Sequence, residues 1–127
     1  MTEIKGIIDD IGIAAFESNI NIAALAVISN SGKIIYQTEN FNLSNQANNL
    51  LHAIKGTNSL KINDQEYLLE GNPSEGIIGT NSKGMGYIIL VPFQGGFLVS
   101  YALPQAEPSR ALAFLKNFTI KLNGQVK

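Results

Sequence analysis

Apolar residues near the start of the chain recur at helical spacing, every three or four positions. Charged residues lie between them, on other faces of the same turns, so the segment is amphipathic. Thr2 precedes the first apolar residue, where a helix N-cap is preferred. The pattern predicts a first helix whose buried stripe is formed by Ile4, Ile7, Ile8, Ile11 and Ala15.

Two β-rich runs follow, separated by a short polar turn. Residues 20–29 are dense in Ile, Ala and Val, and residues 33–38 form a second run after Asn30-Ser31-Gly32. Branched apolar residues on both sides of a glycine-containing turn are typical of a β-hairpin. We expect the first of its strands to be buried, because its run is almost entirely apolar.

A second helical pattern begins at Ser44, a favoured N-cap residue, and Gly56 follows it as a natural stop. Its apolar residues share one face of the predicted helix. They are Ala47, Leu50, Leu51 and Ile54.

From Ser59 onward, short strand-like runs alternate with turn residues. The runs are residues 60–62, 66–70, 76–80, 87–91 and 97–102. The breaks between them hold Asn63-Asp64, Gly71, Pro73, Gly84, Gly86, Gly95 and Gly96. Because short turns join successive runs, we expect antiparallel pairing.

A third helical pattern follows Pro104 and Pro108 and is expected to end before Gly124. Its apolar stripe is Ala111, Phe114, Leu115, Phe118 and Leu122. The order of helix, hairpin, helix, meander and helix predicts an α+β fold in which helices cover an antiparallel sheet. Since no linker or repeat interrupts this order, residues 1–127 are expected to form a single domain.

The charge balance and the lack of Cys narrow the function. Lys and Arg number 9 against 10 for Asp and Glu, a formal net charge of -1, so no overall field favours a nucleic-acid partner. Without Cys, disulfides, thiolate metal ligands and a cysteine nucleophile are excluded. Glu3 and Lys5 interrupt the first apolar pattern, unlike a secretory signal, so we expect a cytoplasmic location.

Candidate catalytic groups are few. His52 is the only histidine and has no nucleophile-elbow pattern beside it, so we interpret it as a surface or packing residue. Glu66 and Glu70 are spaced to share one side of a strand, which favours a solvated face over an acid-base pair. With one His and no clustered Asp, a metal site is not expected either. The sequence predicts a binding protein without catalysis, metal or cofactor.

Two glycine motifs lack the residues that would make them nucleotide loops. Residues 71–76 have the glycine spacing of a phosphate loop, yet Ile77 and Ile78 stand where Lys and Ser or Thr are required. Gly84-Met85-Gly86 is followed by a strand-like run and not by a helix. We interpret both motifs as turns.

A further pattern lies in the order of motifs along the chain. Its parts are Leu68-Leu69-Glu70-Gly71-Asn72-Pro73, Ile77-Ile78-Gly79, Lys83-Gly84-Met85-Gly86, Phe97-Leu98-Val99-Ser100-Tyr101 and Pro108. In the first half, Leu25-Ala26-Val27-Ile28 precedes a glycine turn and Ser44 begins a helix. This order resembles that of the profilin family, and the resemblance spans nearly the whole chain.

The resemblance implies an antiparallel sheet of about six to seven strands, with the N- and C-terminal helices on one face and another helix on the other. It implies a monomeric, cytoskeleton-associated protein that binds actin or an actin homologue and regulates actin assembly. Profilins meet actin with one edge of the meander and the outward face of the last helix. The matching positions are Leu68, Glu70, Thr80, Lys83, Glu107, Ser109, Arg110, Leu112, Ala113, Lys116 and Asn117.

The chain departs from the family pattern in its ligand-binding positions. Profilins stack polyproline on aromatic residues, whereas the matching positions are Ile4, Ile7 and Ile35, and the chain has no Trp. We therefore expect weak or no polyproline binding. Glu70 and Gly79 stand where the family often has a basic residue facing actin, so the partner surface must differ accordingly. The few, scattered lysines predict little or no phosphoinositide binding.

The same order of elements leaves other classes open. A roadblock- or longin-like scaffold, which dimerises to regulate a small GTPase, also alternates helices with a short antiparallel sheet. Residues 60–70 would be surplus in such a scaffold, and a stable dimer in solution would favour it over a monomeric profilin. A sensory domain of the PAS type is a third alternative, and it requires a ligand cavity.

Overall fold

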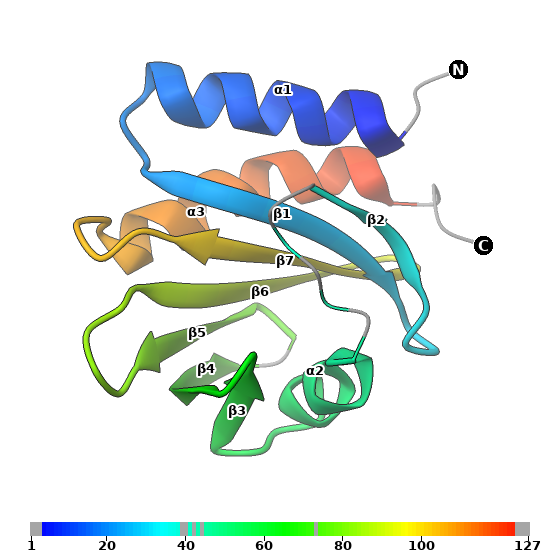
Figure 1. The fold of residues 1–127 in the computed structure, drawn as a ribbon. Coiled ribbons are helices and arrows are strands. Elements are labelled where there is room, and N and C mark those ends of the chain that lie inside the picture. The colour runs from blue at the N-terminus through cyan, green and yellow to red at the C-terminus, as the bar shows by residue number, and fades with distance from the viewer. Residues whose placement is uncertain (1–3, 39–40, 42, 44, 73, 124–127) are drawn as a thin grey trace.

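The computed structural model describes residues 4–38, 41, 43, 45–72 and 74–123. Within them, seven strands form one antiparallel sheet with helices on both faces (Figure 1). The elements are α1 (Ile4–Glu17), β1 (Ile22–Ser29), β2 (Ile34–Gln37), α2 (Ala47–Ile54), β3 (Ser59–Ile62), β4 (Gln65–Asn72), β5 (Gly76–Asn81), β6 (Tyr87–Phe93), β7 (Gly96–Ala102), α3 (Pro108–Thr119) and the short 3₁₀ helix η1 (Ile120–Leu122). The strand order is β2-β1-β7-β6-β5-β4-β3, which places the first hairpin beside the last strand.

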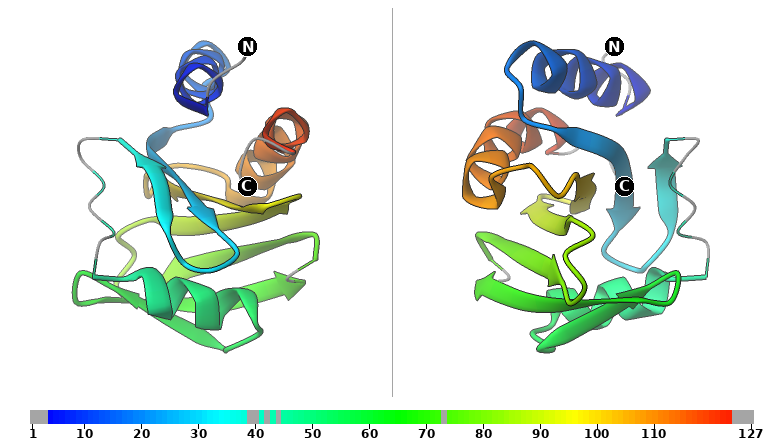
Figure 2. Two further views of the ribbon diagram at one scale, coloured as in Figure 1. Left: turned by 90° about the vertical axis from the view of Figure 1, so that its right-hand side faces the viewer. Right: turned by 60° about the vertical axis from the view of Figure 1, so that its left-hand side comes forward.

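Helices α1 and α3 cover one face of the sheet and α2 covers the other, as the two rotated views show (Figure 2). Each face has its own hydrophobic core. Along β1, Leu25 and Val27 lie in the core beneath α1 and α3, while Ala26 and Ile28 lie in the core beside α2. The buried first strand and the predicted α+β layering are confirmed.

The predicted stripe of α1 is also confirmed. Ile7, Ile8, Ile11 and Ala15 are buried, and Ile4 is half-buried at the start of the helix. This stripe attaches α1 to β1 and to α3, because the same core contains residues of all three elements.

The buried side of α2 differs from the prediction. Leu50 and Ala53 are fully buried, whereas Leu51 and Ile54 are only half-buried. Ala53 was missed because only one narrow side of this short helix meets the sheet, and a small side chain allows that close approach. The predicted cap Ser44 lies outside the described residues, as does Thr2.

The stripe of α3 needs a similar correction. Ala111 and Leu115 are fully buried, and Thr119 joins them. Phe114 and Phe118 are only partly buried, because they lie to one side of the sheet-facing stripe, where their rings contact each other with centroids 5.0 Å apart. The aromatic pair therefore covers the margin of the core and does not fill its centre.

The predicted turns between the strands are found where expected. Asn63 and Asp64 join β3 to β4 with φ angles of 48° and 68°, the left-handed conformation that two-residue hairpin turns require. The motif at residues 71–76 is the β4–β5 hairpin, in which the Ser74 amide donates to Oδ1 of Asn72 at 2.9 Å. Gly84 and Gly86 lie in the turn before β6. Interpretation of both glycine motifs as turns is confirmed.

A buried hydroxyl on β7 generates a stability prediction. Ser100 is fully buried beneath α1 and α3, and its Oγ has no hydrogen-bond partner among the described residues. A buried, unsatisfied hydroxyl is costly, so Ser100→Ala should raise the free energy of unfolding by about 1 kcal/mol in urea titrations. Ser29→Ala is the matched control, because Oγ of Ser29 accepts from the Lys33 amide at 3.1 Å, and its loss should destabilise the chain. A destabilised Ser100→Ala variant would contradict the account.

Tyr67 generates a prediction about alkaline pH. Burial raises the pKa of its phenol above the ordinary value, the Coulombic effect of Tyr101 adds to the rise, and a hydrogen bond with Asn81 opposes it. A raised pKa in the folded state means that the unfolded chain ionises first, so stability present below about pH 10 is lost as pH rises above it. Between pH 8 and pH 10.5 the wild type should lose more unfolding free energy than Tyr67→Phe. Equal losses would refute the assignment.

Candidate functional site

One side of α3 and the strands β4 and β5 share an open face of the molecule. Residues opposite each other in neighbouring antiparallel strands point to the same face. Ile78 is paired with Ile89, whose side chain lies in the core under α1 and α3, so Ile78 and its partner Glu70 point to the face that carries α3. Leu68 and its partner Thr80 point the same way and are exposed.

The contact that places α3 beside these strands is between Leu112 and Gly76. A Cβ atom added to Gly76 would lie 2.5 Å from Cδ1 of Leu112, so the leucine side chain packs directly on the backbone of β5. Leu112 is half-buried, and the end of its side chain is occupied by this contact. It therefore joins the helix to the sheet, while its neighbours on the helix remain open.

Helical geometry identifies those neighbours. Ser109 and Lys116 lie about 60° and 40° around the helix from Leu112, on the side away from the core stripe, and Ala113 lies about 100° away. All three are exposed. They continue the open side of α3 toward Leu68 and Glu70 on the sheet.

Ile120 is an exposed apolar residue that the sequence pattern did not single out. It begins η1, one turn beyond Lys116, and 71% of its surface is exposed. The sequence feature that could have identified it is an isoleucine that lies outside the predicted core stripe of the last helix. We define the α3–β4–β5 surface as Leu68, Glu70, Thr80, Ser109, Ala113, Lys116 and Ile120.

We leave Arg110, which the family pattern included, out of this surface because its side chain points elsewhere. It lies about 160° from Leu112 around the helix. Its Nη2 donates to the carbonyl oxygen of Ser18, just after α1, at 3.0 Å. The side chain therefore links α3 to α1, on the far side of the helix from β5.

The remaining positions of the actin-facing set lie around the margin. Lys83 is exposed in the turn after β5, where its backbone amide donates to Oδ1 of Asn81 at 2.8 Å. Glu107 is exposed at the N-cap position of α3. Asn117 is exposed but lies about 140° from Leu112, near the outer crest of the helix.

The positions matched to the polyproline site are mostly closed. Ile7 is 1% exposed and belongs to the core, so no ligand can reach its side chain. Ile4 and Ile35 are half-buried beside the same core. Weak or absent polyproline binding stays a prediction, as does weak or absent phosphoinositide binding.

Other candidate chemistry is dispersed. His52 is exposed on α2, on the opposite face from α3, and Glu66 is exposed on β4. Among the described residues, no three His, Asp or Glu side chains are grouped as metal ligands.

None of the helices among the described residues is long and apolar enough to cross a bilayer. The α3–β4–β5 surface, with separated apolar residues and one charge of each sign, fits a protein partner best.

The packing of Leu112 on Gly76 generates a prediction. Gly76→Ala places a methyl group against Leu112 at a φ of 150°, so the free energy of unfolding should fall by about 2 kcal/mol. Gly84→Ala is the matched control, because Gly84 also has a positive φ, yet a Cβ atom there meets nothing within 4 Å.

Urea unfolding of both variants measures the difference. Combining Gly76→Ala with Leu112→Ala should recover part of the loss, because the two residues touch and their effects are not additive. A Gly76→Ala variant no less stable than Gly84→Ala would contradict the contact.

Comparison with known proteins identifies relatives that cover almost the whole chain. No family model matches the sequence. Loki profilin-1 of Lokiarchaeum sp. (strain GC14_75) is 36% identical over 131 residues, which cover 94% of this chain and 95% of that protein. The crystal structure of LokiProfilin1 has a TM-score of 0.86, with 34% identity and 97% of each chain covered. LokiProfilin2 in complex with rabbit actin has a TM-score of 0.83 at 34% identity, covering 96% of this chain and 97% of that one.

Proposed function

The chain belongs to the profilin family, and from that premise we propose that it binds actin monomers through the α3–β4–β5 surface and so regulates actin assembly. The observation that carries the proposal is that α3 and the β4–β5 hairpin form one open face of exposed side chains, held together by Leu112 on Gly76. Support comes from the LokiProfilin1 and LokiProfilin2 complexes with rabbit actin, whose profilin chains are 33% and 34% identical to this one.

The composition of the surface suits an interface of ordinary size, about 1,200 to 2,000 Å² in total. Leu68, 55% exposed, and Ile120 provide apolar contacts at its two ends. Glu70 and Lys116 provide opposite charges that orient the partner more than they add affinity. By covering one end of an actin monomer, the chain would control the addition of that monomer to a filament.

Binding without catalysis fits the family. Cytoplasmic location, association with the cytoskeleton, a monomeric state and a single domain over residues 1–127 are parts of this proposal. Sedimentation equilibrium measures the monomeric state directly.

The alternatives drawn from the order of elements receive no support. The relatives are profilins, and no comparison favours the roadblock- or longin-like scaffold or the PAS-type domain. Strands β3 and β4, which would be surplus in a roadblock-like scaffold, are paired members of the sheet.

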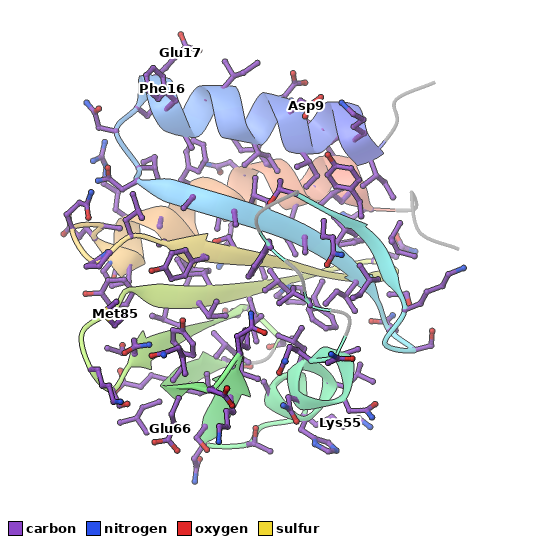
Figure 3. The ribbon with its side chains drawn as sticks, in the orientation of Figure 1. Asp9, Phe16, Glu17, Lys55, Glu66 and Met85 are labelled. Atoms are coloured by element: carbon purple, nitrogen blue, oxygen red, sulfur yellow. The ribbon has the colours of Figure 1, made fainter. Side chains whose placement is uncertain are left out.

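Charge reversal on α3 tests the surface. Lys116→Glu should weaken binding to rabbit actin about tenfold, because Lys116 lies in the proposed contact and truncation or reversal of interface charges costs affinity. Lys55→Glu makes the same change at the C-terminal end of α2, on the opposite face of the sheet, and should leave the affinity unchanged (Figure 3). Fluorescence anisotropy with labelled actin measures both, and sedimentation confirms complex formation.

Arg110→Glu sharpens this test, because Arg110 lies on the same helix but points toward α1. It should affect actin affinity far less than Lys116→Glu. Wild-type chain that fails to bind actin would overturn the proposed function, whereas equal losses for Lys55→Glu and Lys116→Glu would overturn the proposed surface.

A further inference from the structure

A second surface lies between α1 and β1, where the helix passes over that strand. An open apolar groove of about 610 Å³ runs between the two elements. Its lining includes Ile8, Gly12, Ile13 and Phe16 of α1, together with Leu25 of β1 and Thr38 after β2. We call it the α1–β1 groove. It is distant from the α3–β4–β5 surface, because β7 and β6 lie between β1 and β5 in the sheet.

Two large apolar side chains at this groove are exposed and are not part of the buried core. Phe16 is 85% exposed and Ile13 is 60% exposed. Both lie on α1, whose core-facing stripe is already complete without them. Contiguous exposed apolar residues of this kind mark interaction sites.

The shape of the helix flank indicates what fits there. Ile8, Gly12 and Phe16 follow each other at intervals of four residues and form one row along α1. Gly12 makes a notch in the middle of that row, and a Cβ atom added there would meet nothing within 4 Å. A row with a notch accepts the side-chain ridge of another helix at close approach.

The charge of α1 indicates the chemistry of the occupant. Residues Ile4–Glu17 contain one Lys against two Asp and one Glu, so the helix carries a net charge of -2 by side chains. Asp9 lines the groove, and its only ion pair among the described residues is an exposed one with Lys5, which is weak and easily exchanged. Figure 3 shows Asp9 in the first half of α1 and Phe16 and Glu17 at its C-terminal end. The net negative charge of α1 disfavours anionic lipid, nucleic acid and a second copy of the same helix.

We propose that the α1–β1 groove binds an amphipathic helix of a partner protein, whose apolar stripe is flanked by Lys or Arg. An apolar side chain of that helix lies in the notch at Gly12, between Ile8 and Phe16. Its basic residues face Asp9 and Glu17. Charged groups in such an arrangement select the partner and accelerate association, while the buried apolar side chains supply most of the affinity.

Two glycines of α1 provide matched variants. Gly12→Gln fills the notch, whereas Gly6→Gln places the same side chain about 120° around the helix and about 9 Å toward its start, outside the residues that line the groove. A Cβ atom meets nothing within 4 Å at either position, so both variants should fold. Because Gln is a better helix former than Gly, neither should lower the Tm.

The probe is a synthetic 18-residue peptide with Leu on one helical face and Lys on the other, and its counterpart has Glu in place of Lys. We expect the Lys peptide to bind the wild type and Gly6→Gln equally, and Gly12→Gln about tenfold more weakly. The Glu peptide should bind the wild type at least about tenfold more weakly than the Lys peptide. Amide chemical shifts should change along α1 and β1.

Several results would overturn the proposal. One is equal binding of the Lys peptide to the Gly12→Gln and Gly6→Gln variants, and another is equal binding of the two peptides to the wild type. Shift changes confined to other elements would do the same. Concentration-dependent dimerisation lost in Gly12→Gln would assign the groove to a second copy, and tighter binding of anionic phosphatidylserine vesicles than of the Lys peptide would assign it to a membrane. Because actin is absent from these experiments, their outcome is independent of the actin proposal.

Discussion

The contact of Leu112 with Gly76 is the constraint on which the proposed actin-binding surface depends. Because Gly76 has no side chain, the leucine reaches the backbone of β5 and fixes the distance between α3 and that strand. Ser109 and Lys116 then remain exposed on the same face as Leu68 and Glu70. The proposed binding face thus depends on a packing contact, in which one half-buried residue holds the helix to the sheet while its neighbours stay exposed.

The order of elements, the turns and the two-sided burial of β1 could all be predicted from the sequence, because hydrophobic periodicity and turn chemistry are local signals. The details of tertiary packing could not be predicted in this way, because they depend on contacts between distant segments. The narrow contact of α2 selects Ala53, and only the position of α1 explains why Arg110 bonds to Ser18 and turns away from β5. The resemblance implied Arg110 in the actin-facing set from its sequence position, which does not give the direction of its side chain.

The structure separates two kinds of exposed apolar residue. Leu68 and Ile120 stand among polar neighbours at the ends of an open face, as at a protein interface with a polar rim. Phe16 and Ile13 instead border a groove on an acidic helix, which lies over β1, near the opposite edge of the sheet from β4. Since the two surfaces share no residue, the chain has room for actin on one and a basic helix on the other, which would make it an adaptor as well as a monomer-binding protein.

The most direct measurement is cross-saturation transfer by NMR, from rabbit actin to the labelled chain in their complex. The account predicts that amides of β4, β5 and the outer side of α3 lose intensity, while those of α2 and of the β1–β2 hairpin do not. Intensity losses centred on α2 or on the α1–β1 groove, with β4 and β5 unaffected, would contradict it.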